Sequence, residues 1–489
     1  MDESEDLSMG SSRANGNGLG RRELIKRSAA IGLVTVPTMS FLASCASSDS
    51  GSDDKPEKKG TKSKKNPLGV NESAPLDFVL FDGGFGSEYG KDAAAIYEKN
   101  FPKAKVKFTP TQKIQSTLQP RFNGGTPPDL IDNSGAEQMD MGVLVGKKQL
   151  ADLTPLLDAP SYDDPAKKVR DTLRPGIVEM GQYEGEACYV FNYAYTVYGV
   201  WYSQTNLDKL GVEYPETWDD MLKVCATAKK KGIAGWTYAG KYPYYLPFSL
   251  FPFIGKIGGR KVLDAIDNLE PNAWKDPAVK AGFEAYYELY KKGYVLKGTP
   301  GLDHIQSQTE WTKGNALFIP NGSWVENEAA KTTPKDFQMK VAAPSSLDSS
   351  DALPFGTLWA SGGEPFIVPK NAKNPDGGME QLRVMLSEAS SKNFTQKVKS
   401  LSALNGGTDG LQLSTALQSG IDALDKAGEN VLNPRLQDWY VDLNKQKIGV
   451  GALGEMMAGR MTPAEAIKKC QDFADAAAKD DSIPHYKHR

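Results

Sequence analysis

The alternation of apolar strands with helical stretches near the start of the folded chain constrains its fold most. The strand-length run PLDFVLF, which follows Ala74, ends in the glycine-rich turn DGGFG; the stretch SEYGKDAAAIYEKNF, the strand AKVKFTP, a helix around Ile114 to Phe122 and the strand PDLIDNSG come next. This order predicts a right-handed parallel α/β layer. Ligands of such sheets bind at the carboxyl ends of the strands, which here are Asp82 to Phe85 and Asp132 to Ser134.

Two later helix starts are marked by capping residues. Thr217 stands three residues before Asp220, close to the pattern of a capping box. Thr462 is placed as an N-cap, with Pro463 at the first helical position and Glu465 at the third. We therefore expect helices to begin at both threonines.

The segment Arg21 to Cys45, RRELIKRSAAIGLVTVPTMSFLASC, has the features of an export signal. Its apolar stretch, interrupted by Pro37, is too short to span a bilayer but suits a cleavable signal peptide. Paired arginines are typical of the twin-arginine route, which carries folded proteins. The LASC sequence resembles the bacterial lipobox, in which the cysteine is lipidated and becomes residue one. We predict a twin-arginine lipoprotein signal peptide at residues 1–44 and lipidation of Cys45.

Residues 45–72 are predicted to be a disordered tether. Ala46 to Leu68 consists of Ser, Gly, Asp and Lys with almost no apolar residue, so it cannot bury enough surface to offset its ordering entropy. No later stretch approaches the roughly 20 consecutive apolar residues of a membrane-spanning helix. We therefore expect the lipid on Cys45 to anchor the protein to the outer face of the cell membrane.

The composition excludes several classes of function. The formal net charge is -3, from 58 Lys and Arg against 61 Asp and Glu, whereas a nucleic-acid partner demands a basic face. Only three histidines occur, which removes most catalytic dyads and metal sites, and we expect no cofactor and no metal. Cys188, Cys225 and Cys470 show no C-x-x-C spacing, so we expect buried free thiols rather than a disulfide framework.

Sequence motifs of common enzymes are missing. The DGGFG turn contains neither G-x-G-x-x-G nor G-x-x-x-x-G-K-[ST], so a nucleotide site there is a weaker interpretation than a tight turn that forms a cleft wall. G-x-S-x-G and H-E-x-x-H are absent as well. A carboxylate pair for glycoside hydrolysis stays open as an alternative, because only its separation in space would identify it.

Aromatic residues gather in stretches that also contain amides and acids. Tyr189 to Tyr202 reads YVFNYAYTVYGVWY, with a strand expected at Tyr198 to Tyr202, and Trp236 to Phe248 reads WTYAGKYPYYLPF. Aromatic faces suit the C–H faces of sugar rings, and neighbouring polar groups can bind their hydroxyls, so the pattern favours a carbohydrate cleft. The alternative is that most of these rings belong to the core.

Trp324 has the most informative position of these aromatic residues. It follows an expected strand at Ala316 to Pro320 and the turn Asn321-Gly322-Ser323, which should project the indole beyond the sheet. Glu326 and Asn327 come directly after it.

Together these features resemble the extracellular solute-binding proteins of carbohydrate ABC transporters, in the group that includes maltodextrin-binding proteins. The motifs that carry the resemblance are Asp132 to Ser134, Tyr189 to Tyr202, Pro215 to Trp218, Gly314 to Trp324 and Ser361 to Pro369. More narrowly, VPTMSFLASCAS, SAPLDFVLFDGGFG, QPRFNGGTPPDLIDNSGA, DDPAKKVRDTL, GKYPYY and IPNGSWVENE are similar to N-acetylglucosamine- and N,N'-diacetylchitobiose-binding lipoproteins.

The resemblance implies an α/β, two-lobed periplasmic-binding-protein-like fold of type II, with hinge-linked lobes and chain crossings between them. By that template lobe 1 takes residues 73–195 and 343–404, lobe 2 takes residues 196–341 and 405–479, and residues 480–489 form a C-terminal tail. The template also implies a monomer.

The resemblance further implies which residues line the ligand site. Asn133 and Ser134 would form the wall of lobe 1, Tyr195 and Thr196 the hinge, and Trp324 the chief stacking platform. The family often has charged or aromatic residues at the positions of Asn133 and Thr196, so this chain departs from the pattern there. The full set of implied contacts is Asn133, Ser134, Tyr195, Lys241, Tyr244, Tyr245, Trp324, Glu326, Gly363, Glu364 and Trp439.

By the same resemblance the protein captures an amino sugar or a chitin-derived oligosaccharide and delivers it to the subunits of an ABC permease without changing it chemically. The open alternatives are a binder of another oligosaccharide, such as a maltose-like or plant-derived sugar, an exported glycoside hydrolase or lyase, and a structural or sensor lipoprotein that binds a wall polymer.

Overall fold

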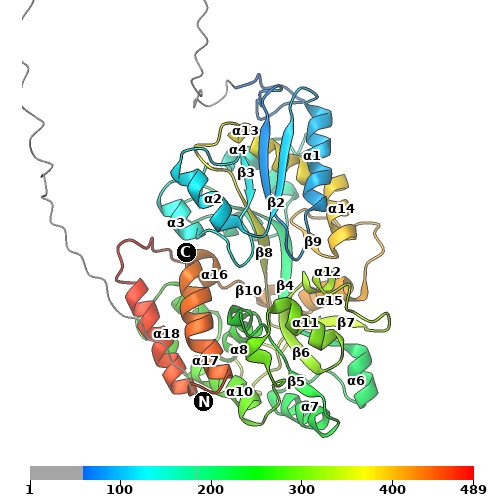
Figure 1. Cartoon of the computed structure of the whole chain (residues 1–489), viewed down its shortest axis with the longest axis vertical. Coiled ribbons are helices and arrows are strands. Elements are labelled where there is room, and N and C mark those ends of the chain that lie inside the picture. Colours follow the sequence, from blue (N-terminus) through cyan, green and yellow to red (C-terminus); the bar gives the residue numbers. More distant parts are fainter. Residues whose placement is uncertain (1–58, 184, 489) are drawn as a thin grey trace, which may run out of the picture. The chain divides into compact units, whose positions relative to one another are not determined.

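One mixed sheet runs through the protein, whose computed structural model describes residues 59–183 and 185–488 (Figure 1). Its strand order is β2-β1-β3-β8-β4-β6-β5, with β10 paired to β8 and with β7 and β9 paired to β4. The strands are β1 (Leu76–Phe81), β2 (Val106–Thr111), β3 (Leu130–Asp132), β4 (Phe191–Ser203), β5 (Ala234–Trp236), β6 (Ala316–Gly322), β7 (Met339–Ala342), β8 (Leu358–Ile367), β9 (Leu401–Ser402) and β10 (Val431–Leu432).

The first three strands form the predicted parallel layer. β1 pairs in parallel with both β2 and β3, and the connecting helices α1 (Glu88–Asn100) and α2 (Ile114–Asn123) follow the expected stretches. Phe78 and Leu80 are fully buried in β1, where they pack with the apolar face of α1. The α/β layer expected from the sequence is therefore confirmed.

β4 and β8 extend through both halves of the sheet. In β4, Tyr195 pairs with Leu401 of β9, whereas Tyr198 pairs with Gly322 of β6, so the strand changes partners within three residues. In β8, the end at Ile367 pairs with β3 and the start at Leu358 pairs with β10. Two antiparallel strands thus connect the groups of elements that we call lobe 1, around β1 to β3, and lobe 2, around β5 to β7.

Helices cover the sheet in each lobe, with lobe 1 in the upper part of Figure 1 and lobe 2 in the lower part. The further helices of lobe 1 are α3 (Met141–Gly146), α4 (Thr154–Asp158), η1 (Val169–Thr172), α5 (Ile177–Met180), α13 (Pro375–Met385) and α14 (Glu388–Val398). Those of lobe 2 are α6 (Gln204–Leu210), α7 (Trp218–Lys230), η2 (Pro243–Tyr245), α8 (Pro247–Gly258), α9 (Arg260–Asp267), η3 (Ala273–Lys275), α10 (Pro277–Lys291), η4 (Thr299–Gly301), α11 (His304–Thr312), α12 (Val325–Glu328), α15 (Thr415–Ala427), η5 (Gly428–Asn430), α16 (Leu436–Trp439), the π-helix η6 (Leu443–Gly454), α17 (Glu455–Met457) and α18 (Pro463–Ala477).

The return of the chain to lobe 1 lies later than the sequence indicated. Residues 343–357, expected in lobe 1, pack on lobe 2: the backbone N–H of Trp218 donates to the carbonyl of Ser346 at 2.7 Å, and that of Leu353 donates to the carbonyl of Lys256 at 3.0 Å. This stretch is rich in Pro, Ser and Asp and has no hydrophobic period, so no pattern marked its partners. The crossing itself lies within β8.

The predicted tether is shorter than expected at its folded end. Leu68 and Val70 are buried in the core of lobe 1, and the Asn66 side chain donates to the carbonyl of Val70 and accepts from its N–H. The two apolar side chains and the bonded amide fix residues that the polar composition had assigned to the tether. Residues 1–44 and Cys45 lie outside the described residues.

The three cysteines of the described residues, Cys188, Cys225 and Cys470, are free and buried, as predicted. Burial raises the pKa of the thiols of Cys188 and Cys225 to about 12 and raises that of Cys470 further. None of these thiols is therefore poised to react as a thiolate. No helix within residues 59–183 and 185–488 combines the length and the apolar character that crossing a membrane requires.

The segment after α18 contacts both lobes. The Tyr486 hydroxyl donates to the carbonyl of Gly142 in α3 at 2.6 Å, and the Tyr486 N–H donates to the Tyr440 hydroxyl at 3.0 Å. His488 hydrogen-bonds Asp267 of α9 at 2.8 Å. Residues 480–488, predicted as a tail, are thus packed across the boundary between the lobes.

Both predicted helix caps are confirmed. The hydroxyl of Thr217 accepts the N–H of Asp220 at the start of α7, and Thr462 and Glu465 form a complete capping box at the start of α18.

Because the capping box satisfies backbone N–H groups that the helix itself leaves unpaired, we expect Thr462→Ala to lower the free energy of unfolding by about 1 kcal/mol in urea titrations. Thr309→Ala is the matched control, since this threonine lies inside α11 and bonds the carbonyl of Ile305. Alanine has the higher helix propensity, so the control should be neutral or slightly stabilising, and an equal loss in both variants would contradict the capping role.

Candidate functional site

Trp324 stands at the boundary between the lobes and is held by three aromatic rings of lobe 2 and the crossing strand. Its ring contacts Tyr198 of β4 at 5.7 Å, Tyr245 at 6.0 Å and Phe248 at 5.6 Å between centroids, all edge to face. Such pairs orient an aromatic ring more tightly than burial alone. Tyr245, expected in the floor, is thus brought beside the expected platform, and Tyr244 lies against Tyr245 with 5.2 Å between the ring centres.

The indole does not project beyond the sheet as the turn indicated. A Cβ added at Gly322 would lie 2.2 Å from the Trp324 ring, so the indole folds back over the end of β6 into the space that this glycine leaves. Only glycine at position 322 permits this close approach. The ring is partly buried and turned toward lobe 1.

The glycine-rich turn after β1 forms the facing wall in lobe 1. A Cβ at Gly84 would lie 3.1 Å from the Cβ of Trp324, and the amide of Asn327 donates to the Gly84 carbonyl at 2.6 Å. The lobes are therefore in contact at this turn, and its role as a cleft wall stays a prediction. Asn327 was not among the predicted site residues, although it directly follows the Trp324 motif.

Lys445 joins the lobes at a second point. This buried side chain of η6 donates to the carbonyl of Gly135 at 2.7 Å and to Oε1 of Gln138 at 3.0 Å, both in lobe 1, and its Nζ lies 5.1 Å from the centre of the Tyr244 ring. Burial lowers the pKa of Lys445 to about 7, against the opposing effect of nearby carboxylates. No sequence motif surrounds this lysine, and sequence reasoning missed it.

A chain of buried polar groups lies where β3 ends beside β8. The hydroxyl of Ser134 is hydrogen-bonded to Asp132 and, at 2.5 Å, to Oε2 of Glu364, while the hydroxyl of Tyr89 donates to Oδ2 of Asp132 at 3.4 Å. Burial raises the pKa of Asp132 well above its usual value, with the charge of Glu364 adding to the effect, and burial also raises the pKa of Glu364. The sequence placed Asp132 at a strand end where ligands bind, but Asp132 was not among the implied contacts.

The remaining residues expected in the lobe 1 wall and in the hinge lie apart from one another. The amide of Asn133 is occupied within its own loop, since it donates to the carbonyl of Met139 and accepts from its N–H. A Cβ at Gly363 would lie 2.7 Å from the hydroxyl oxygen of Thr196, so these two residues meet on one face of the crossing strands. Tyr195 is the neighbour of Thr196 in β4, and its side chain therefore points to the opposite face.

Three predicted contacts lie apart from the Trp324 cluster. Glu326 accepts the hydroxyl of Ser414 at 2.7 Å, and Lys241 is exposed. Trp439 is buried between Arg435 and His488. The Arg435 guanidinium and the centre of the His488 ring each lie 4.9 Å from the centre of the Trp439 ring. The structure does not bring these side chains together with Tyr245 and Trp324.

His304 is a further residue that sequence reasoning left unassigned. Its Nε2 lies 3.3 Å from Glu328, and its ring lies 5.5 Å from that of Tyr242 and 6.3 Å from that of Tyr245. Burial acts against the charged imidazole, but the hydrogen bond to Glu328 outweighs it and raises the pKa of His304. This pair supports the floor of the cluster from α11.

Asp132 and Glu364 form a close pair of carboxyl groups, because both contact the hydroxyl of Ser134. The described part of the chain contains no group of three or more His, Cys, Asp or Glu side chains placed to hold a metal ion.

Comparison with known proteins identifies the family. The sequence profile of the bacterial extracellular solute-binding proteins matches residues 84–392. A curated protein named diacetylchitobiose binding protein NgcE, from Streptomyces coelicolor, is 36% identical over 477 residues, which cover 96% of this chain and 98% of that protein. The chain belongs to the bacterial extracellular solute-binding proteins.

Solved structures of other binding proteins share the fold of this solute-binding protein. A chitin oligosaccharide binding protein matches with a TM-score of 0.65 at 20% identity, over 82% of this chain and 98% of that one. The raffinose complex of the solute-binding protein RafE matches with a TM-score of 0.65 at 18% identity, over 82% and 99%. The predicted two-lobed α/β fold is confirmed.

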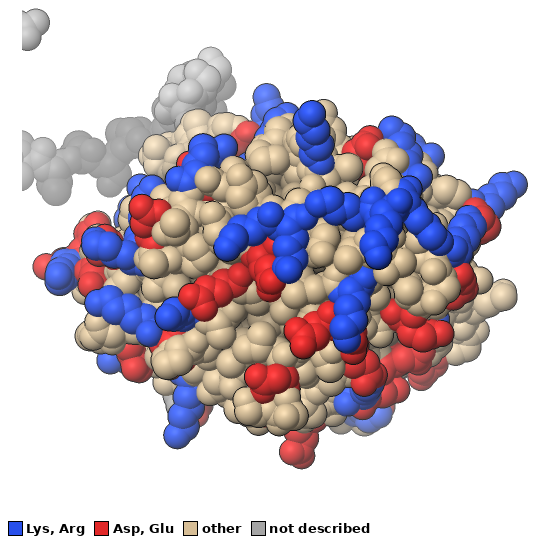
Figure 2. Space-filling model, turned by 90° about the horizontal axis from the view of Figure 1, so that it is seen from below, with Lys and Arg blue, Asp and Glu red and all other residues tan. Residues whose placement is uncertain are grey.

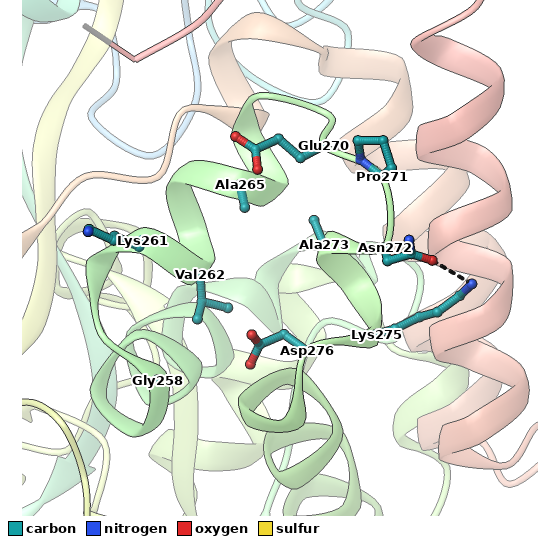
Figure 3. Close-up of a pocket in the computed structure, with 10 residues that line it drawn as sticks. All are labelled: Gly258, Lys261, Val262, Ala265, Glu270, Pro271, Asn272, Ala273, Lys275 and Asp276. Carbon is teal, nitrogen blue, oxygen red and sulfur yellow. Dashed lines mark hydrogen bonds between the residues drawn. The ribbon is translucent and has the colours of Figure 1, made fainter.

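Two further features of lobe 2, a cavity and a charged face, differ from the Trp324 cluster. Figure 3 shows a cavity of lobe 2 at which Lys275 donates to Asn272 at 2.8 Å. The cavity has a volume of about 410 Å³, and no aromatic side chain lines it. Its lining residues are Gly258, Lys261, Val262, Ala265, Glu270, Pro271, Asn272, Ala273, Lys275 and Asp276. Figure 2 shows the lower face, where lysines and arginines lie beside aspartates and glutamates. This face of the solute-binding protein presents no single-sign surface.

The contact between Gly84 and Trp324 predicts how the lobes respond to a small wedge. Gly84→Ala places a methyl group 3.1 Å from the Trp324 Cβ and should disfavour the closed arrangement by about 1 to 3 kcal/mol, as overpacking does in cores. Small-angle X-ray scattering of the unliganded protein should then show a larger radius of gyration. Gly301→Ala is the matched control, because a Cβ there meets nothing within 4 Å. An unchanged radius in Gly84→Ala would show that this contact does not hold the lobes together.

Proposed function

We propose that the protein is the substrate-binding component of a carbohydrate ABC importer and that it captures N,N'-diacetylchitobiose, N-acetylglucosamine or both between its lobes. The observation that carries the proposal is the Trp324 cluster, which faces Gly84 of lobe 1 across the lobe boundary. The near full-length similarity to a protein named for diacetylchitobiose binding supports this choice of sugar. The ligand would be passed to the permease subunits unchanged, so the protein would not act as an enzyme.

The chemistry of the cluster fits an amino sugar. The indole of Trp324 offers an apolar face to the C–H face of a sugar ring, and Tyr244 and Tyr245 extend that surface. Ser134 and Glu364 supply hydroxyl and carboxyl groups from lobe 1, and Lys445 adds a donor for an acetamido carbonyl or a hydroxyl. Contacts from both lobes to one ligand would favour closure, because only the closed state makes both sets.

The predicted contacts divide according to their surroundings. We assign direct contact to Ser134, Tyr244, Tyr245, Trp324, Gly363 and Glu364, and we add Asn327 and Lys445. Asn133 holds its loop through Met139, and Tyr195, Lys241, Glu326 and Trp439 would contact only a ligand that extends beyond the Trp324 cluster.

We propose further that the protein is exported by the twin-arginine route and anchored by a lipid on Cys45 at the outer face of the cell membrane, where it acts as a monomer. The order of paired arginines, apolar stretch and LASC sequence supports this proposal. Anchoring keeps a binding protein near its transporter, and the polar residues before Lys59 give it reach.

The sugar assignment and the platform are tested together by calorimetric titration with N,N'-diacetylchitobiose. The unmodified protein should bind the disaccharide, and Trp324→Ala should weaken binding by at least about 30-fold, the loss expected for an aromatic hot spot. Trp324→Phe should retain more affinity than Trp324→Ala, because a ring still faces the sugar. Equal affinity in the Trp324→Ala variant and the unmodified protein would refute the platform.

Tyr290→Ala, which removes an exposed ring of α10, is the matched control for Trp324→Ala and should bind normally.

The alternative functions, a binder of another sugar and a hydrolase, predict different results. A thermal-shift comparison of chitobiose with maltose and raffinose identifies another oligosaccharide if one of them raises the melting temperature more. Chromatography of the sugar after incubation should return it intact, whereas cleavage products would establish a hydrolase.

Lipid anchoring is tested by Cys45→Ala in cells. The substituted protein lacks the thiol that carries the lipid, so it should move from the membrane fraction to the culture fluid or the soluble fraction on immunoblots. Cys225→Ala is the control, because that thiol is buried in lobe 2, and it should stay with the membrane. Membrane retention of Cys45→Ala would show that another feature holds the protein there.

A further inference from the structure

The polar chain Asp132–Ser134–Glu364 links the end of β3 to the crossing strand β8 and is more than a set of ligand contacts. β3 and β8 are antiparallel, with Asp132 paired to Phe366, so Glu364 comes opposite Ser134, two residues after the end of β3. Ser134 bonds Glu364 at 2.5 Å on one side and Asp132 on the other. The backbone of Glu364 has a φ of +50°. Residues other than glycine rarely adopt this conformation, and those that do are concentrated at functional sites.

The contacts among Asp132, Ser134 and Glu364 need more protons than are present when both carboxyl groups are ionised. The hydroxyl of Ser134 carries one proton and can donate it to only one of its two carboxyl partners. The other contact needs a proton that a carboxyl group supplies. At least one of the two acids is therefore neutral in the closed arrangement.

The surroundings favour the neutral acid as well. Asp132 is fully buried, and its neighbours are the hydroxyl of Tyr89 from α1 and the ring of Tyr193 from β4, which stacks on Tyr89. Within the described residues no lysine, arginine or histidine is paired with either carboxyl. Lys445 is occupied by the carbonyl of the adjoining Gly135 and by Gln138. Desolvation without a cation raises the pKa of a carboxyl group.

We propose that Asp132 is a positioning residue that shares one proton with Glu364 through the hydroxyl of Ser134, so that closure on a neutral sugar takes up a proton and Glu364 meets the ligand as a hydrogen-bond acceptor without a full negative charge. This inference rests on the proposed function and deepens it. The proton comes from solvent on closure and returns there on opening. The shared proton stays in the contacts with Ser134, so the free oxygen of Glu364 accepts from a hydroxyl or an acetamido N–H of the sugar.

Sharing one proton fixes the sign of the pH dependence. The pair lies within lobe 1 and persists when the lobes open, but the pKa of Glu364 should then lie nearer its usual value because water reaches it, whereas burial raises the pKa values of Asp132 and Glu364 in the closed arrangement. Between those two values closure binds a proton, so sugar affinity falls as the pH rises, by up to about tenfold per pH unit for one proton. Below that window both states are protonated and the affinity should be constant.

Calorimetry in two buffers counts the proton directly. Titrations with N,N'-diacetylchitobiose at mildly acidic pH, where Lys445 is charged in both arrangements, in phosphate and in Bis-Tris, whose ionisation enthalpies differ, should show uptake of up to about one proton by the unmodified protein. In Asp132→Asn the amide keeps the shape of the side chain but cannot share the proton, so uptake should vanish and the affinity should become less dependent on pH. Glu364→Gln is the second variant, and it should also abolish uptake if Asp132→Asn fails to fold.

Asp129→Asn is the matched control. Asp129 is another buried aspartate with a raised pKa, but it accepts the backbone N–H groups of Asp77 and Asn374, away from the chain that contains Ser134. Its variant should take up the same proton as the unmodified protein. Sugar binding without proton uptake by the unmodified protein, or unchanged uptake in Asp132→Asn, would overturn the inference.

A ligand-free measurement separates this inference from the proposed function. Infrared spectroscopy of the sugar-free protein at mildly acidic pH, where an ordinary carboxyl group is ionised, should show the carbonyl band of a protonated carboxyl group in the unmodified protein, because the pair within lobe 1 is formed without sugar, and the band should weaken in Asp132→Asn. If no sugar in the panel binds but the band behaves in this way, the sugar assignment fails while the shared proton is supported. Absence of the band would overturn the shared proton.

Discussion

The antiparallel pairing of β4 with β8 fixes how the two lobes face each other, and every group at the boundary takes its place from this register. Thr196 pairs with Ser361 and Ala194 pairs with Gly363, so the hydrogen-bonded ladder continues across the change from lobe 1 to lobe 2. A ladder of this kind can twist or bend, but sliding it by one residue would reverse the faces of all its side chains. The lobes can therefore hinge about these strands while the groups on each side stay aligned.

Few polar contacts oppose that hinge motion at the cluster itself. Asn327 bonds Gly84, and Lys445 bonds Gly135 and Gln138, while the remaining contact at Trp324 is apolar. Other bonds cross the boundary elsewhere, from Arg435 to the carbonyl of Met180 and from Tyr486 to that of Gly142, and a ligand bound to both lobes would add its contacts only in the closed state. The uncharged surroundings of Asp132 and Glu364 suit the same purpose, since a neutral sugar offers no charge to compensate a buried carboxylate.

Local patterns in the sequence predicted the parts of the fold that depend on neighbouring residues. The parallel β1 to β3 layer, the caps at Thr217 and Thr462, the buried thiols and the placement of Tyr245 beside Trp324 all follow from periodicity, capping chemistry or a recognisable motif. The direction of the indole at Trp324 depended on space left by Gly322, which a sequence does not display.

Features that depend on distant partners could not be predicted in this way. Lys445 finds its acceptors about 310 residues earlier in the chain, in a loop with no matching signal. The stretch after Ala343 was assigned to the wrong lobe because its partners are backbone groups near Trp218 and Lys256. Asp132 was passed over because an acid at the end of a strand acquires its role only when β8 brings Glu364 beside it.

The contacts of Tyr486 and His488 with α3 and α9 bear on how the protein is made. These residues follow the elements of both lobes in the chain, yet Tyr486 bonds Gly142, which is translated 344 residues earlier, and His488 bonds Asp267. Their packing can form only after residue 488 has been synthesised. This part of the boundary therefore closes late, and a nascent chain stalled before residue 486 would carry the rings of Trp439 and Tyr440 without their cover.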